Sequence, residues 1–134
     1  MSLDPPQVLV ERSAIDVLVD RTHPRHDELR ATYLELVEQY RREEILLVAV
    51  SDDLAVTGRQ WFARRTGDFA PVDPLSVGTQ HRRAAEQMVT EPHDPKFALT
   101  LVMCERHKVR RVFTVDPRFE AYDVELVPVG DADS

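Results

Sequence analysis

Short apolar runs alternate along this chain with longer stretches that have the periodicity of helices. Residues 7–11, 45–50 and 111–115 have the length of strands and are rich in β-branched and other apolar side chains. This alternation is typical of a parallel sheet, because helices connect the parallel strands and cover both faces. We therefore expect an α/β fold: a three-layer α/β/α sandwich with right-handed crossovers and a mostly parallel sheet of four to five strands.

Two of the expected helices carry their apolar residues on one side only. In the first, Leu29, Tyr33 and Leu36 recur at intervals of three and four, and in the second, over residues 97–107, Phe97, Leu101 and Cys104 do so. Such one-sided stripes indicate amphipathic helices that pack against a sheet. We also expect Ser13 to cap a helix over residues 14–19, and a further helix from about residue 73 to residue 89.

The size and composition of the chain indicate one globular unit. It has 134 residues, of which 43% are hydrophobic, so we expect a single domain over residues 1–134 with loose ends at residues 1–6 and 130–134. No apolar run approaches the roughly 20 residues of a membrane span, and we expect a cytoplasmic protein without a membrane partner. The single Cys104 excludes an internal disulfide, and we expect its thiol to be buried.

The charge of the chain limits the partners that it can attract. The formal net charge is −7 at pH 7, so there is no general attraction to phosphate backbones. Binding of nucleic acid would require a local basic patch. Three arginine pairs are candidates for such a patch or are solvated ends of helices and strands: Arg64-Arg65, Arg82-Arg83 and Arg110-Arg111.

Two of the expected strands end in a carboxylate. Glu11 ends the first apolar run and Asp116 follows the run over residues 111–115. The carboxyl ends of parallel strands meet at one edge of a sheet, where ligands bind. Two acids there are candidates for holding a hard cation such as Mg²⁺ or Mn²⁺. Two plainer interpretations stay open: Glu11 pairs with an arginine such as Arg12, and Asp116 starts a turn before Pro117.

In residues 8–15, 20–26 and 113–119 the chain resembles the PIN-domain family, particularly the bacterial toxin nucleases of the VapC type. Residues 8–15 resemble the family opening, an apolar strand followed by Asp, any residue, Ser and Ala. Residues 20–26 are similar to the loop that leads into the long second helix, and residues 113–119 are similar to the late strand and turn, with Phe three residues after the Asp. The likeness covers most of the chain through the order and spacing of these segments, and it implies a PIN-like fold.

The resemblance also implies a reaction: about four acids hold one or two Mg²⁺ or Mn²⁺ ions, which activate water for attack on a phosphodiester. Carried over by position, the first family acid falls on Glu11 and the fourth on Asp116, whereas the second falls on Thr57 and the third on Phe97. Two further residues complete the candidate site. Asp94 lies about one helical turn before Phe97 and is either a substitute ligand or a helix N-cap, and Ser13 keeps a supporting hydroxyl.

The sequence therefore predicts metal ligands at Glu11, Asp94 and Asp116, with weak binding of Mg²⁺ or Mn²⁺. Two functions follow from the resemblance. In the first, the chain is expected to be a PIN-like protein with an incomplete metal site that is weak or inactive in catalysis and binds RNA or a protein partner. Alternatively, it is an active divalent-metal-dependent endoribonuclease, the toxin of a toxin–antitoxin pair. The implied partners are single-stranded RNA, an antitoxin protein and, in a homodimer, a second copy of the chain.

Overall fold

Five parallel strands form the centre of the molecule. The structure, a computed structural model, describes residues 5–55, 72–88 and 94–129. The sheet has the order β3-β2-β1-β4-β5, and every neighbouring pair is parallel. The strands are β1 (Gln7–Val10), β2 (Leu46–Val50), β3 (Val72–Leu75), β4 (Arg111–Phe113) and β5 (Glu125–Leu126). The predicted mostly parallel sheet of four to five strands is confirmed.

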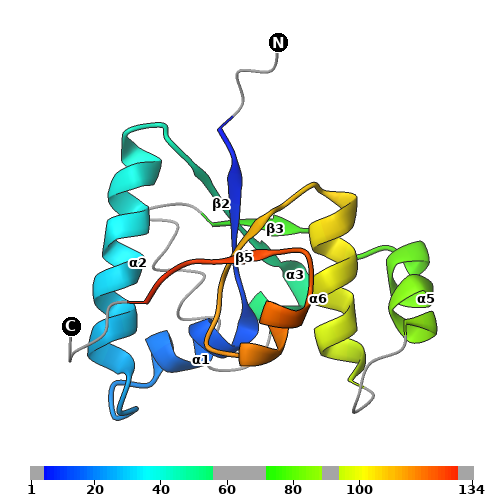
Figure 1. Ribbon diagram of the computed structural model, residues 1–134, viewed down its shortest axis with the longest axis horizontal. Helices are drawn as coiled ribbons and strands as arrows, with labels where there is room; N and C mark the ends of the chain where they lie inside the picture. Colours follow the sequence, from blue (N-terminus) through cyan, green and yellow to red (C-terminus); the bar gives the residue numbers. More distant parts are fainter. Residues whose placement is uncertain (1–4, 56–71, 89–93, 130–134) are drawn as a thin grey trace.

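Helices cover both faces of this sheet (Figure 1). They are α1 (Arg12–Val19), α2 (His26–Arg41), α3 (Ser51–Leu54), α5 (Thr79–Gln87), α6 (Pro95–Arg106) and the 3-10 helix η1 (Pro117–Ala121). One core joins β1, β2 and β4 to α1 and α2 through residues such as Val8, Ile15 and Leu36. The opposite core joins the sheet to α5 and α6 through residues such as Leu9 and Met103. Alternate residues of β1 thus enter different cores, which is why this strand is apolar throughout.

The pairing of the central strand β1 with its neighbour β4 brings two distant parts of the chain together. β1 and β4 are neighbours, with Val10 opposite Phe113. The residues that follow these strands therefore lie side by side, and the backbone N–H of Glu11 donates to the carbonyl of Phe113 at 3.0 Å. The edge of the sheet formed by the carboxyl ends of the strands thus carries the chain segments that begin at Glu11 and Thr114, as the sequence predicted.

Two local predictions were wrong. Ser13 lies inside α1 and does not cap it, because the helix begins at Arg12 with Glu11 in the N-cap position. The helix expected from about residue 73 begins only at Thr79, and Asp73 and Pro74 belong to β3. β3 is an edge strand of the sheet, and an edge strand accommodates the missing N–H of a proline.

Two further observations bear on the predictions. Within the described ranges 5–55, 72–88 and 94–129, no helix has the length and apolar character needed to cross a membrane. Thr57 and the pair Arg64-Arg65 lie outside the described residues.

Candidate functional site

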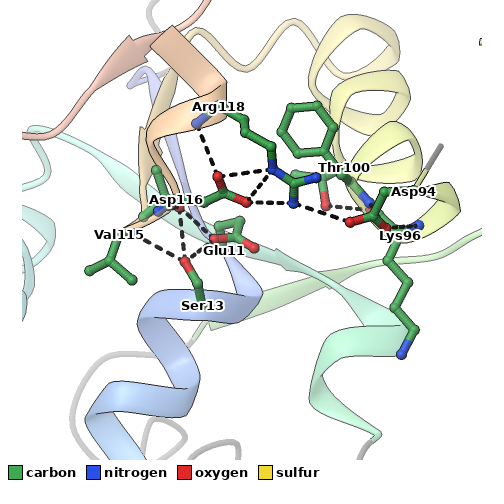
Figure 2. A network of polar contacts seen from close by, with 10 residues as sticks. Glu11, Ser13, Asp94, Lys96, Thr100, Val115, Asp116 and Arg118 are labelled. Carbon is green, nitrogen blue, oxygen red and sulfur yellow. Dashed lines mark hydrogen bonds and ion pairs between the residues drawn. The ribbon is translucent and has the colours of Figure 1, made fainter. Parts of the chain in front are cut away.

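A polar network occupies the carboxyl-terminal edge of β1 and β4 (Figure 2). Glu11 lies at its centre and is only 3% exposed. Its Oε1 accepts hydrogen bonds from the hydroxyls of Ser13 and Thr114, the second at 2.5 Å. The buried carboxylate is thus held by hydroxyl donors from two segments about a hundred residues apart in the sequence, and such donors offset the cost of burying a charge.

The same hydroxyls fix the turn after β4. Ser13 Oγ accepts from the backbone N–H of Val115 at 3.1 Å, and Thr114 Oγ1 accepts from the N–H of Asp116 at 2.9 Å. The two hydroxyl oxygens are 3.0 Å apart. Glu11, Ser13 and Asp116, three of the predicted site residues, therefore belong to one network, in which Thr114 joins Glu11 to the backbone of Asp116.

Asp116 opens a short helix and binds an arginine within it. It is the N-cap of η1, and its Oδ1 accepts from the backbone N–H of Arg118 at 3.0 Å, while Pro117 occupies the first turn. The guanidinium of Arg118 also donates to Asp116: Nε lies 3.1 and 3.0 Å from the two carboxylate oxygens, and Nη2 lies 2.7 Å from Oδ2. Both oxygens of Asp116 are therefore occupied.

Asp94 has the same construction at the start of α6. It is the N-cap of that helix, and its Oδ1 accepts from the N–H groups of Lys96 at 3.1 Å and Phe97 at 3.2 Å. Its other oxygen, Oδ2, lies 3.1 Å from Nη2 of Arg118. Asp94 is thus a helix N-cap, which is one of the two interpretations that the sequence left open. Arg118 connects Asp94 to Asp116.

Aromatic rings support the bridging guanidinium. Cζ of Arg118 lies 4.3 Å from the centroid of the Phe97 ring, a cation–π distance. Phe97 is 3% exposed, and its ring packs against those of Phe119 and Tyr122 at centroid distances of 4.7 and 5.4 Å. The side chain at the position expected to hold the third acid therefore contributes a hydrophobic surface on which the arginine rests.

The charges in the cluster shift each other's protonation equilibria. Hydrogen bonds from Arg118 lower the pKa of Asp116 below its ordinary value, although burial opposes this. Burial also raises the pKa of Asp94, but its hydrogen bonds to Phe97 and Arg118 outweigh that effect and leave the pKa lowered. The two aspartates raise the pKa of Arg118. Asp94, Asp116 and Arg118 are thus all charged at neutral pH.

Cys104 lies on the α6 side of the sheet and has no place in this network. It is a free, buried cysteine, as predicted. Burial, together with the negative charge of Glu11, raises the pKa of its thiol to about 12. A thiol with this pKa is almost entirely protonated at neutral pH and is therefore a poor metal ligand and a poor nucleophile.

In this arrangement other groups engage the acids that were predicted as metal ligands. Mg²⁺ and Mn²⁺ need several oxygen ligands with free lone pairs that converge on one point. Among the residues that the structure describes, no three His, Cys, Asp or Glu side chains gather closely enough to hold a metal. Arg118 forms ion pairs with both Asp94 and Asp116. The assignment of Glu11, Asp94 and Asp116 as metal ligands stays a prediction.

Arg118 is the site residue that the sequence analysis missed, and a repeated pattern points to it. The chain contains Asp94-Pro95-Lys96-Phe97 and Asp116-Pro117-Arg118-Phe119, two copies of Asp-Pro-basic-Phe. Each copy begins a helix with its aspartate as N-cap. In the fold, the phenylalanine rings of the two copies pack against each other at a tilted angle, and the two aspartates pair with the same arginine.

Of the arginine pairs proposed as basic patches, the two that lie within the described residues do not gather at this site. Arg111 begins β4 and Arg110 precedes it, so this pair lies at the amino-terminal edge of the strands, the edge opposite the network. Arg82 lies on α5 and forms a surface ion pair with Asp52 at 2.8 Å. Nearer the network, Lys96 is exposed, and Arg12 is close enough for its charge to lower the pKa of Asp94.

Comparison with solved structures identifies the fold. The chain is similar to the crystal structure of Mycobacterium tuberculosis VapC20, described as a sarcin-ricin loop cleaving toxin, with a TM-score of 0.62. The match covers 90% of this chain and 99% of that chain at 14% sequence identity. No protein-family model matches the sequence, and neither does any curated protein. The predicted resemblance to VapC-type PIN domains is therefore confirmed at the level of the fold.

Proposed function

We propose that this PIN-fold protein is a non-catalytic relative of the VapC-type nucleases and acts by binding single-stranded RNA without cleaving it. One observation carries the proposal: the guanidinium of Arg118 occupies the carboxylates of both Asp94 and Asp116. These are two of the three acids that the sequence offers as metal ligands. The third, Glu11, is buried and accepts hydrogen bonds from two hydroxyls.

The electrostatics of the cluster argue against metal-dependent hydrolysis. Metal-assisted cleavage of a phosphodiester depends on a concentration of negative charge that binds the ions against competition from water. Here an arginine offsets part of that charge, and Phe97 places a buried ring at one of the expected acid positions. Both features weaken the affinity for a divalent cation, whereas neither prevents a surface beside the cluster from binding a ligand.

Basic residues beside the cluster favour RNA as the ligand. Lys96 is exposed two residues after the Asp94 cap, and Arg12 is partly exposed at the start of α1. Figure 2 shows the Lys96 side chain pointing away from the two aspartates, so its ammonium is available to a phosphate. With a net charge of −7, we expect weak binding that decreases steeply as salt is added.

A cleavage assay tests the absence of catalysis. The purified protein is incubated with labelled single-stranded RNA and Mn²⁺ beside the variant Asp116→Asn, prepared in the same way. We expect the same background rate from both, because Asp116 performs no chemistry. Cleavage by the unaltered protein that disappears in Asp116→Asn would refute the proposal, and the variant also controls for contaminating ribonucleases.

A binding assay tests the choice of ligand. Fluorescence anisotropy with a labelled single-stranded RNA at low salt compares the unaltered protein with Lys96→Glu and, as a matched control at a distant surface position, Arg110→Glu. We expect Lys96→Glu to weaken binding at least about fivefold and Arg110→Glu to change it less. If the unaltered protein binds no RNA, the proposed ligand is wrong and a protein partner becomes the better explanation.

An active endoribonuclease toxin remains the second candidate, and one observation favours it. Glu11 and Asp116 are linked through Thr114 at one edge of the sheet, which is where ligands bind in parallel α/β folds. The similar VapC20 is described as a sarcin-ricin loop cleaving toxin. The cleavage assay above decides between the two candidates.

A further inference from the structure

We infer that the outward face of α2 binds the same face of a second copy of this chain, with the two helices antiparallel. Five exposed side chains form this face, which we call the α2 stripe: Asp27, Arg30, Leu34, Glu38 and Arg41. The stripe lies outside the polar network at the carboxyl-terminal edge of the sheet. The inference therefore goes beyond the proposed function, and its test uses no RNA.

Leu34 is an apolar side chain at the centre of this outward face. It is 46% exposed, and among the described residues only Tyr122 is a comparably exposed large hydrophobic side chain. An open groove beside it is lined by Leu34, Glu35, Glu38, Gln39 and Arg42. Figure 1 shows α2 at one side of the molecule, away from α5 and α6, so a second copy can approach it. A single exposed leucine is common on protein surfaces, so the charges around it decide what it indicates.

The α2 stripe complements itself when it is reversed. The intervals along it are three, four, four and three residues, which read the same in both directions. Its order is acid, base, leucine, acid, base. Residues at these intervals lie on one side of an α-helix. When a second helix is laid on the first in the opposite direction, with the leucines together, every acid therefore meets a base.

A two-fold axis at Leu34 gives the pairing in detail. In such an isologous contact, each residue before the leucine faces the residue that lies equally far after it in the second copy. Arg30 then faces Glu38 about 6 Å along the helix from the axis, since each residue rises about 1.5 Å. Asp27 faces Arg41 about 10 Å from the axis by the same rise. Each pair occurs twice. Parallel helices would instead place every charge opposite its own copy, so the antiparallel arrangement is favoured.

Two charges of the stripe lack an ion pair within one copy. Glu38 pairs with Arg41 of the same helix at 2.8 Å, with both side chains more than half exposed. Asp27 and Arg30 have no ion-pair partner among the residues that the structure describes. In the dimer they join the Glu38–Arg41 pair of the other copy, so four charges alternate at each end of the contact. A network of this kind contributes more than an isolated surface pair.

The size of the contact sets its strength. α2 has 16 residues, and one helix pair of this length lies at the low end of interface sizes. The net charge of −7 on each copy adds a general repulsion. We therefore expect a weak dimer, with a Kd of about 10–100 µM at neutral pH.

Sedimentation velocity with charge-reversal variants tests the inference on the full chain. Arg30→Glu and Glu38→Arg each place like charges opposite one another, so each alone should dimerise at least about tenfold more weakly than the unaltered protein. An equimolar mixture of the two should form a heterodimer, because one variant then presents two acids where the other presents two bases. Arg110→Glu is the matched control: it makes the same charge change as Arg30→Glu at an exposed position before β4 and should dimerise as the unaltered protein does.

The apolar centre is tested by a milder change. Leu34→Ala keeps a good helix former and removes the exposed side chain, so the dimer should weaken at least about fivefold. Because Leu34 is nearly half exposed, the monomer should keep its fold, which circular dichroism checks.

Several outcomes would overturn the inference. An unaltered protein that stays monomeric up to about 500 µM has no such interface of the expected strength. Single charge variants that dimerise within about twofold of the unaltered protein, a mixture that stays monomeric, or an equal loss in Arg110→Glu would each exclude the antiparallel pairing. If a variant does not fold, NMR of the unaltered protein decides: dilution should shift the amide signals of residues 27–41, and shifts confined to other elements would refute the inference.

Discussion

Thr114 is the residue whose alteration tests the polar network most sharply. Its hydroxyl donates to Glu11 at 2.5 Å and accepts from the N–H of Asp116 at 2.9 Å, and the side chain is 5% exposed. Thr114→Val keeps the shape and removes both contacts. A hydrogen bond to a charged group contributes about 1.5–3 kcal/mol, and the partly buried N–H of Asp116, left without this acceptor, costs at most the roughly 1–3 kcal/mol of a fully buried one. We expect the free energy of unfolding to fall by about 3 kcal/mol, because relaxation recovers part of the sum.

Urea denaturation at neutral pH measures this loss, and Thr100→Val is its matched control. Thr100 is 3% exposed, and its hydroxyl donates at 3.2 Å to the carbonyl of Lys96, which also accepts a backbone hydrogen bond in α6. The control should therefore cost less than about 1 kcal/mol. If the two variants are destabilised equally, to within about 0.5 kcal/mol, the hydroxyl of Thr114 does not support Glu11 and the description of the network is wrong.

Three further predictions follow from the same site. Asp94→Ala should lower the free energy of unfolding by about 1 kcal/mol in urea melts, as expected for a lost N-cap, whereas Asp94→Asn, which keeps the cap, should cost less. Because their pKa values are lowered, the ionised side chains of Asp94 and Asp116 stabilise the folded protein. This stabilisation is complete above the unfolded pKa of about 3.9 and is lost as the pH falls through the lower pKa values of the folded protein. The urea concentration at the unfolding midpoint should therefore decrease when the pH is lowered below about 4, and it should decrease less in Asp116→Asn. Cys104, whose thiol pKa is raised to about 12, should react with a thiol reagent at pH 8 roughly a thousandfold more slowly in the folded protein than in urea.

Much of the fold could be predicted from the sequence because burial on both faces leaves a plain pattern. β2 lies within the continuous apolar run of residues 45–50, and the stripe of Leu29 and Leu36 marks the buried side of α2. The pattern failed at β3, where Asp73 and Pro74 are poor strand residues. An edge strand makes few demands on its side chains, so periodicity carries little information there.

The candidate site was predictable in location and less so in chemistry. Parallel pairing of β1 and β4 dictates that Glu11 and the segment at Asp116 meet, and the expectation of a parallel sheet was sufficient to predict this. The partners of the acids depend on side-chain contacts across the fold. Arg118 contacts Asp94 where the rings of Phe97 and Phe119 pack against each other, and a contact between two helix starts has no periodic signature in the sequence. The repeated Asp-Pro-basic-Phe pattern was the available signal.

We propose that Arg118, and no metal ion, bridges Asp94 and Asp116. Anomalous diffraction from crystals grown with millimolar Mn²⁺ tests it most directly, because the method locates manganese and the arginine in one experiment. Our account predicts no anomalous peak within coordination distance of either aspartate, with the guanidinium between them. A manganese peak shared by Glu11, Asp94 and Asp116, with Arg118 turned away, would contradict it.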